Sequence, residues 1–174
     1  YDKSRIHGVD AIYRKACEMQ AQGASIVDIG GQSTRQYNGV PQTAQVHSVS
    51  QEIEKVIPAI AKIKRDTDIQ VSIDTQHAIV MQAAIDVGVD LINDVEALQN
   101  KGALDCVARS SAHVCLMHRL PADRRGTGHA VRADEVTEFL AKRIQHCLLS
   151  GIEKKRIILD LSLIHISEPT RRTT

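Results

Sequence analysis

The stretch GASIVDIGGQSTR, residues 23 to 35, indicates what kind of sheet this chain forms. A glycine leads into a short aliphatic run, Ser25–Gly30, that has the length and composition of a buried strand. The run is followed by a second glycine and a cluster of polar residues that ends in Ser-Thr-Arg. A strand that begins just after a glycine and ends in a polar loop is typical of a repeated βα unit.

The same arrangement recurs along the chain. Gly88 precedes a second such run, Asp90–Val95, and segments with helical periodicity separate the apolar runs. Repeated helix, glycine and strand predict parallel strands, and both an open nucleotide-binding sheet and a closed barrel fit that pattern. The expected strands are Ser25–Gly30, Ile69–Asp74, Asp90–Val95, His113–His118 and Arg156–Asp160.

Three of the intervening segments have the apolar stripe of an amphipathic helix. Ser48 with Gln51 three residues later predicts a capping box at the start of the second one. The stripes are Val9, Ile12, Ala16 and Met19; Ile53, Val56, Ile57, Ile60 and Ile63; and Val136, Phe139, Leu140, Ile144, Cys147 and Leu148.

Composition excludes several classes of protein. The chain of 174 residues can bury one core, and its 22 basic against 21 acidic residues create no field that would attract nucleic acid or an acidic membrane. It has neither an apolar run of about 18 residues, as a membrane span needs, nor a signal-peptide pattern. The four cysteines form no Cys-x-x-Cys pair, which favours reduced thiols over disulfides or a zinc site. We therefore expect a cytoplasmic protein.

Every expected strand carries a polar residue at or near its carboxyl end. In a parallel sheet the carboxyl ends of the strands meet at one rim, so these side chains are predicted to converge there. A single Asp or Asn after a strand is more often a turn former or a helix cap, and the hypothesis of a site depends on the repetition. The residues are Asp28, Asp74, Asn93 with Asp94, His118 and Asp160.

Two local patterns point to the kind of site. Gln70, Ser72 and Asp74 alternate with aliphatic residues, which is typical of a barrel interior or an active-site floor. After Asp28, a glycine hinge is followed by Ser33, Thr34 and Arg35, whose hydroxyl and guanidinium donors suit a phosphate or a carboxylate. An ordinary loop is the alternative interpretation, since the stretch matches neither a Walker loop nor a Gly-x-Gly-x-x-Gly motif.

The stretch Gly23–Arg35 resembles the signature of the dihydropteroate synthases, folate-pathway enzymes that sulfonamides inhibit. The resemblance continues through Val71–Thr75, Leu91–Val95, Val114–His118 and Ile157–Asp160, in the family's order, over residues 1–160. It implies an α/β fold, the (β/α)8 TIM barrel, of which about five strands are present here. It also implies a transferase in which p-aminobenzoate displaces diphosphate from a hydroxymethyl-dihydropterin diphosphate.

The resemblance implies roles for individual residues. Asp74 and Asn93 would hold the pterin ring, and Asp160 would bind its amino edge. Ser33, Thr34 and Arg35 would belong to the loop beside the diphosphate and the p-aminobenzoate. The amine of p-aminobenzoate is itself a nucleophile, so no catalytic Ser or Cys is expected, and catalysis would rest on orientation and stabilisation of the leaving diphosphate. Magnesium would take its ligand from a segment before Tyr1, and the complete protein is expected to be a homodimer.

Some segments depart from the family pattern. The basic segment Arg119–His129 suits phosphate, but we expect a solvated loop there, and we expect His118 to be structural. Leu161–Arg171 resembles translated sequencing adapter, so 161–174 is interpreted as a non-native tail after a partial barrel over 1–160. With three strands expected to be missing, the chain alone is predicted to be inactive.

Other functions stay open at this point. A pterin-binding methyltransferase that passes a methyl group from methyltetrahydrofolate to a corrinoid would share the Asp and Asn contacts. The Ser-Thr-Arg loop favours the synthase, because a methyltransferase has no diphosphate to bind. A non-catalytic pterin-binding protein and another phosphate-binding barrel enzyme are the remaining alternatives.

Overall fold

The structure, a computed structural model, describes residues 6, 8–31, 48–119 and 132–161. The strands form one parallel sheet in which each strand pairs with the next along the chain. Each begins at the predicted residue or one residue later, so the strand predictions are confirmed. The strands are β1 (Ile26–Gly30), β2 (Gln70–Asp74), β3 (Leu91–Asp94), β4 (His113–Met117) and β5 (Ile157–Asp160).

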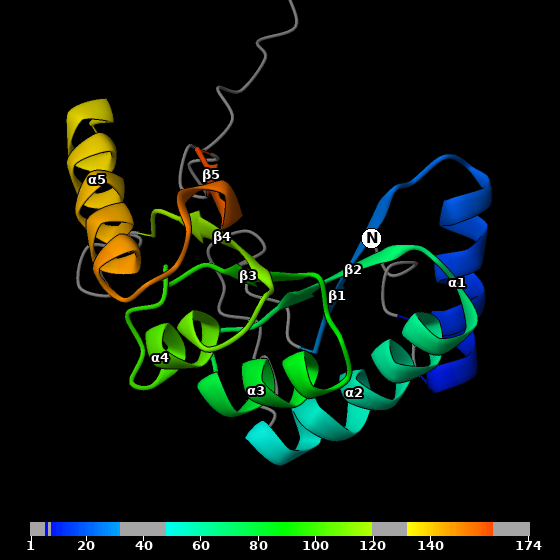
Figure 1. Cartoon of the computed structure of the whole chain (residues 1–174). Helices are drawn as coiled ribbons and strands as arrows, with labels where there is room; N and C mark the ends of the chain where they lie inside the picture. The colour runs from blue at the N-terminus through cyan, green and yellow to red at the C-terminus, as the bar shows by residue number, and fades with distance from the viewer. Residues whose placement is uncertain (1–5, 7, 32–47, 120–131, 162–174) are drawn as a thin grey trace, which may run out of the picture.

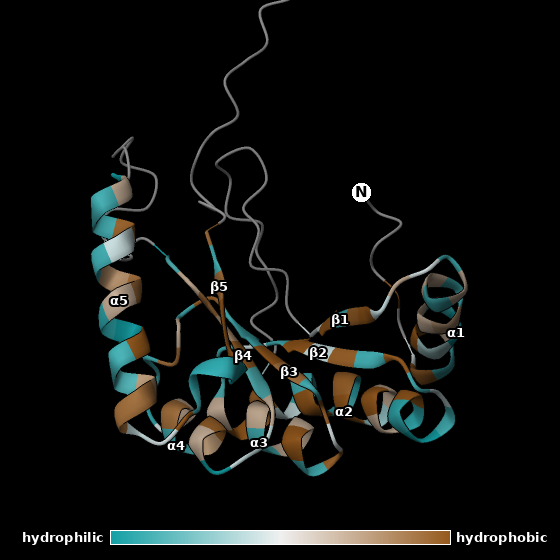
Figure 2. Cartoon of the chain, turned by 45° about the horizontal axis from the view of Figure 1, so that its top comes forward, coloured by the Kyte–Doolittle hydropathy of each residue, from teal (hydrophilic) through white to brown (hydrophobic). Residues whose placement is uncertain are grey.

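The helices lie along one face of this sheet. Figures 1 and 2 show α2, α3 and α4 beneath the strands, with α1 and α5 beside the two edges. The predicted capping box is present, since Ser48 Oγ accepts from the Gln51 amide at 3.2 Å and the Gln51 side chain accepts from the Ser48 amide at 3.0 Å. The helices are α1 (Val9–Ala21), α2 (Val49–Asp66), α3 (Ala78–Asp86), α4 (Ala103–Ala108) and α5 (Ala133–Leu149), with a short 3-10 turn at Lys154–Arg156.

Strand order decides between the two architectures that the sequence left open. A doubly wound sheet reverses its strand order and carries helices on both faces. Here the order is sequential, β1 to β5, and the helices cover one face, as in the wall of a TIM barrel (Figure 2). The described part of the chain is a five-stranded section of such a wall.

The core lies between the sheet and the helices. Val71, Ile73 and Ile92 point from the strands into this layer and are completely buried. They meet the stripe of α2, whose Val56, Ile60 and Ile63 are at most 2% exposed. The opposite face of the sheet carries the polar alternation of β2, and the expected division between an apolar and a polar face is confirmed.

Two predicted stripe residues lie outside the core. Met19 is 39% exposed and Leu148 is 44% exposed. Each belongs to the last turn of a helix that lies beside an edge of the sheet (Figure 1). Periodicity correctly predicted these two helices, but it did not predict how far along each helix the apolar stripe stays buried.

Two further sequence predictions can be compared with the described residues. All four cysteines are free thiols, and three of them are buried, in agreement with the absence of a disulfide framework. Among the helices described, none is both long enough and apolar enough to cross a membrane.

Candidate active site at the carboxyl ends of the strands

Three polar side chains from the first three strands come together on the open face of the sheet. Asp74 pairs in register with Gly30 on one side and with Asn93 on the other. The side-chain amide of Asn93 reaches back over β2 and donates from Nδ2 to Asp28 Oδ2 at 3.4 Å. The structure therefore brings Asp28, Asp74 and Asn93 into one cluster, as the strand-end pattern predicted.

Asp160 shares this face from the far edge of the sheet. It pairs in register with Met117, two residues beyond Cys115 on β4. Burial, and after it the charges of Asp160 and Asp28, raise the pKa of the Cys115 thiol to about 11. Since both carboxylates act on the same thiol, the open face is acidic from β1 to β5, and Cys115 is a protonated, inert part of its floor.

Asp74 has the most strongly altered chemistry in the cluster. Burial, and after it the charges of Asp28, Glu52 and Asp94, raise its pKa to about 6, while the charge of Arg119 opposes that rise. Such a carboxyl changes its protonation state close to neutral pH. When ionised it is an acceptor that can take two N–H donors from one edge of a flat heterocycle.

Two buried polar atoms in or next to the cluster have no hydrogen-bond partner among the described residues. They are Asn93 Oδ1 and Ser72 Oγ, and Ser72 is only 3% exposed. Buried polar groups in folded proteins are nearly always paired. Unpaired atoms on a polar face next to a carboxylate of raised pKa are typical of a surface that a polar ligand completes.

Sequence reasoning did not identify a buried acid beneath this rim. Glu52 of α2 is 1% exposed and its Oε2 lies 2.8 Å from His77 Nδ1, at the start of α3. Gly31 approaches Glu52 so closely that an added Cβ would come within 2.6 Å of its Cγ. The signal was available, because position 52 continues the buried α2 stripe of Val56 and Ile60 at a spacing of four.

Asp94 does not belong to the rim, and its predicted place there is wrong. Alternation along β3 turns it toward the helices while Asn93 faces the open side. Its carboxylate accepts from the amides of Glu96 at 2.9 Å and Leu98 at 2.8 Å. Asp94 therefore holds the turn in which Ala97 and Leu98 adopt positive φ angles of 51° and 59°.

The first residues after β4 differ in how well they were predicted. His118 is 8% exposed and packs edge-to-face on Phe139 with ring centroids 5.1 Å apart, a packing contact that supports the expected structural role. Arg119 was expected in a solvated loop, but its Nη1 lies 2.5 Å from Glu96 Oε1 and its side chain is 18% exposed. Arg119 is therefore largely shielded from solvent, and its ion pair with Glu96 joins the segments that follow β3 and β4. The expectation of a solvated loop does not hold for this residue.

Several predicted residues cannot be compared with the structure. Ser33, Thr34 and Arg35, which were assigned to the diphosphate and p-aminobenzoate loop, lie outside the described residues, as does 120–131. In the described ranges, no three His, Cys, Asp or Glu side chains are grouped so that they could hold a metal ion. The magnesium ligand that the resemblance places before Tyr1 is not among these residues, and magnesium stays a prediction.

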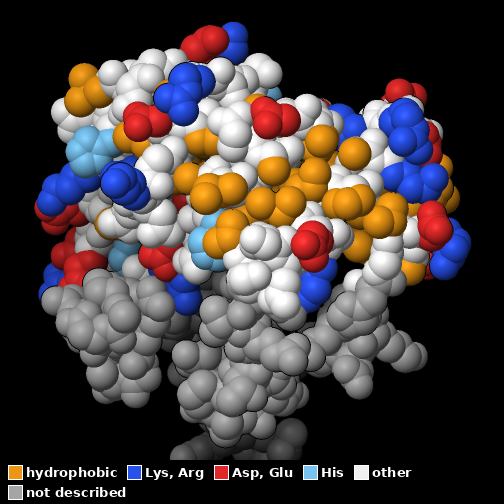
Figure 3. Space-filling view, turned by 90° about the horizontal axis from the view of Figure 1, so that it is seen from below, with side chains coloured by type: hydrophobic (Ala, Val, Ile, Leu, Met, Phe, Trp, Pro, Cys, Tyr) orange, Lys and Arg blue, Asp and Glu red, His pale blue; other side chains and the backbone are white. Residues whose placement is uncertain are grey.

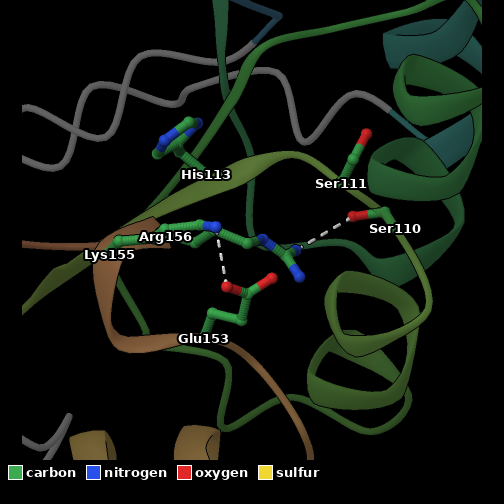
Figure 4. A pocket seen from close by; sticks show the side chains of 6 residues that line it. All are labelled: Ser110, Ser111, His113, Glu153, Lys155 and Arg156. Carbon is green, nitrogen blue, oxygen red and sulfur yellow. Dashed lines mark hydrogen bonds and ion pairs between the residues drawn. The ribbon is translucent and has the colours of Figure 1, made fainter.

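A hollow lies at the opposite end of the strands from the candidate site. It has a volume of about 530 Å³ and is lined by residues from the amino-terminal ends of β4 and β5 (Figure 4). Its charged groups are already used, because Lys155 pairs with Glu153 at 2.8 Å and Arg156 donates to the carbonyls of Val107 and Ala112. The charged side chains of this hollow stabilise the fold, so the candidate site remains the rim at the carboxyl ends of the strands.

Fold and rim together define a parallel α/β protein of barrel type with an acidic binding face at the carboxyl ends of its strands. The family described as pterin binding enzyme matches residues 1–172. The chain belongs to this family of pterin-binding enzymes. The match runs into residues 161–172, and the interpretation of 161–174 as a non-native tail stays a prediction.

Several known dihydropteroate synthases are similar to this chain. The enzyme of Haemophilus influenzae is 34% identical over 163 residues, which cover 92% of this chain and 57% of that protein. The crystal structure of the Vibrio fischeri enzyme superposes with a TM-score of 0.76 at 38% identity, covering 88% of this chain and 56% of that one. The Xanthomonas albilineans enzyme, solved in complex with 7,8-dihydropteroate, has a TM-score of 0.72 at 35% identity, covering 89% and 54%. This chain thus spans about half the length of the relatives it matches.

Proposed function

We propose that the protein to which this chain belongs is a dihydropteroate synthase, a transferase of folate biosynthesis that joins p-aminobenzoate to a hydroxymethyl-dihydropterin diphosphate and releases diphosphate. The observation that carries the proposal is the cluster of Asp28, Asp74 and Asn93 at the rim of a barrel wall. The identity to synthases over about nine-tenths of the chain supports it. The complex of the Xanthomonas albilineans relative with 7,8-dihydropteroate supports the choice of ligand.

The rim can perform the recognition step of this reaction. A pterin presents several N–H donors along its pyrimidinone edge, and the rim offers the acceptors that such an edge needs. Asp74 and Asn93 would bind the ring from neighbouring strands, and Asp160 would bind the amino edge from β5. Holding the ring fixed orients its hydroxymethyl carbon toward the attacking amine. Much of the entropy loss needed to bring the two reactants together then occurs on binding and no longer adds to the barrier of the reaction step.

The remaining parts of the reaction lie outside the described rim. Ser33, Thr34 and Arg35 are proposed to bind the diphosphate and the p-aminobenzoate, by the donor chemistry of their side chains. Magnesium would supply charge stabilisation to the diphosphate when bound, with a protein ligand from sequence before Tyr1. We further propose that the complete protein is a cytoplasmic homodimer, and that the chain of residues 1–174 is inactive by itself.

The experiment recovers the complete open reading frame around this sequence and assays its product for dihydropteroate formation. We expect turnover with p-aminobenzoate, and a loss of at least about 100-fold in kcat/KM for Asp74→Ala, since that variant removes a charged hydrogen-bonding group from the transition state. Asp86→Ala is the matched control, because Asp86 lies on α3 and pairs with Gln82. It should retain activity.

Other outcomes would point to the other functions. A folded full-length product that binds pterin but forms no dihydropteroate would contradict the proposal and favour a non-catalytic pterin-binding protein. Methyl transfer from methyltetrahydrofolate to a corrinoid would identify the methyltransferase instead. Reading the genomic frame beyond Asp160 also tests the adapter interpretation, which fails if the genome itself encodes Leu-Ser-Leu-Ile-His.

A further inference from the structure

The hydrogen bond between Asn93 and Asp28 constrains which way the Asn93 amide faces. An amide side chain has one end that accepts and one end that donates, and the two ends are nearly identical in shape. An ionised carboxylate accepts hydrogen bonds and has none to donate. Asp28 therefore selects the orientation in which Asn93 Nδ2 points toward it, at 3.4 Å, and Oδ1 points elsewhere.

The carbonyl oxygen Oδ1 of the Asn93 side chain is the atom that a ligand would contact. Asn93 Oδ1 is buried and has no hydrogen-bond partner among the described residues, while Nδ2 is engaged by Asp28. Asn93 lies beside Asp74 in the register of β2 and β3, so this oxygen lies on the face where a ligand of Asp74 would sit. A ring placed there meets two neighbouring acceptors, one from each strand.

We propose that Asp28 is a positioning residue that sets ligand specificity: it fixes the Asn93 amide with its oxygen toward the ligand, and so selects rings that offer an N–H donor at that point. This inference rests on the proposed function for its ligand class. It assigns Asp28 a part in recognition without contact between Asp28 and the substrate. Ser72 Oγ, the other unpaired buried atom, can donate or accept and does not impose a preference of its own.

The substitution Asp28→Asn tests the proposal with little change in shape. An amide at position 28 can face Asn93 with either end, so the Asn93 amide is free to turn and offer Nδ2 to the ligand. The probes are a pterin and two analogues, each of which lacks one donor group: the ring without its 2-amino group and the 3-methyl ring. Binding is measured by calorimetry with the full-length protein that carries this chain.

The expected result is a change in discrimination. The wild-type protein should bind the analogue that lacks the donor facing Asn93 at least about tenfold more weakly than the pterin, because a buried acceptor is then left unpaired. In Asp28→Asn that ratio should fall to about threefold or less. Asp86→Asn, the same change on the outer surface of α3, should keep the wild-type ratio.

A paired exchange separates positioning from a merely structural role and covers the case in which Asp28→Asn folds poorly. In the double variant Asp28→Asn with Asn93→Asp, the amide now lies on β1 and the carboxylate on β3, so the hydrogen bond is restored in reverse and an acceptor oxygen again faces the ligand. The wild-type preference should return.

Discrimination that stays within twofold of wild type in Asp28→Asn overturns the inference, as does an exchange variant that folds but does not recover the preference. Failure of the proposed function looks different. In that case the wild-type full-length protein itself binds no pterin.

Discussion

Asp74 stands at the carboxyl end of β2 with acidic side chains near it on several elements. Its pKa is raised to about 6 by burial, by Asp28 on β1, by Glu52 on α2 and by Asp94 on β3, against the opposing charge of Arg119 after β4. Repulsion of this kind destabilises the ionised, folded state. A rim built to accept N–H donors thus lowers the stability of the fold that carries it.

The first prediction concerns stability. Because the pKa of folded Asp74 lies above its ordinary value, the folded state keeps the proton longer than the unfolded chain, and stability is lost as the pH rises from about 4 through about 6. Asp74→Asn should remove this loss. A rise from 3.8 to about 6 is about 2 pK units, which corresponds to at most about 3 kcal/mol at pH 7.

Urea unfolding of the full-length protein at pH 7.5 and pH 4 would measure it, since the slope and midpoint give the free energy of unfolding. The gain should be largest at the higher pH and small at the lower one. A variant that is less stable than wild type at pH 7.5 would contradict this account of Asp74.

The second prediction concerns ligand binding and also follows from the raised pKa of Asp74. A rise in pH lowers stability but should strengthen binding. Pterin N–H donors need the ionised form of Asp74, so the affinity of the free protein for pterin should fall up to about tenfold per pH unit below about 6 and level off above it. Binding measured from pH 5 to pH 8 by fluorescence tests this. A flat profile over that range would show that the carboxyl is ionised throughout.

At the scale of the elements, the turn after β1 is constrained by the helix beneath it. Gly31 lies so close to α2 that an alanine Cβ would meet Glu52 Cγ at 2.6 Å and Val56 Cγ1 at 3.3 Å. Overpacking of this kind typically costs about 1–3 kcal/mol. Gly31 thus allows a close approach between the turn and α2.

The third prediction follows from this contact. Gly31→Ala should lower the free energy of unfolding by about 1–3 kcal/mol, because Glu52 must move and its pairing with His77 is disturbed. In a Glu52→Ala background, where Cγ is gone, the same change should cost clearly less. A double-mutant cycle from denaturant melts gives the coupling. Equal costs in the two backgrounds would mean that the contact with Glu52 is not the cause.

The loop between β3 and α4 is held by Asp94 and by α5. Arg143 of α5 donates to the carbonyls of Ala97 at 2.7 Å and Leu98 at 3.1 Å, the two residues with positive φ. The neighbouring Glu96 carries the ion pair to Arg119. Helix α5 thus helps to set the position of a charged pair beside the rim.

The fourth prediction concerns this loop. Asp94→Ala leaves the part-buried amide of Glu96 and the buried amide of Leu98 without their acceptor, which should cost about 2–4 kcal/mol of stability. Asp94→Asn keeps one acceptor oxygen and should cost less. Thermal melts of both variants beside Asp105→Ala, an acid in the first turn of α4, would measure it. Equal melting temperatures for Asp94→Ala and the control would contradict the assigned role.

At the scale of the whole molecule, the described sheet has two edge strands, β1 and β5. Apolar side chains lie open at both of them, with Ile26 40%, Ile158 45% and Leu159 41% exposed. Figure 3 shows that hydrophobic side chains also gather on the outer surface of the helix layer. Unpaired strand edges with open apolar residues are templates for association, and a closed barrel removes such edges.

The fifth prediction concerns the chain of residues 1–174 expressed alone. It should associate into soluble oligomers or aggregates and show no synthase activity, whereas the full-length protein should be a discrete species. Light scattering after size exclusion, with a matched activity assay, distinguishes the two. A monodisperse, monomeric chain that binds pterin would show that the five-stranded section is stable by itself.

The positions of the strands, of the three helices with an apolar stripe and of the capping box at Ser48 follow from the amino-acid sequence, because each depends on residues a few positions apart. The period of a strand or helix and the partner of a cap lie within one or two turns of chain. The sequence also predicted that the polar residues at the strand ends lie at one rim, since parallel strands share one carboxyl edge. The family signature followed for the same reason, as it is carried by short contiguous motifs.

Tertiary structure decided which of these polar residues act together. Asn93 and Asp28 are 65 residues apart in the chain, and their hydrogen bond exists only because β1 and β3 flank β2. The same folding places Asp94 on the other face and brings Glu52 of α2 close enough to alter Asp74. Hydrogen bonds and charges act through distances in space, and distances between residues far apart in the chain are created only when the sheet and its helices pack.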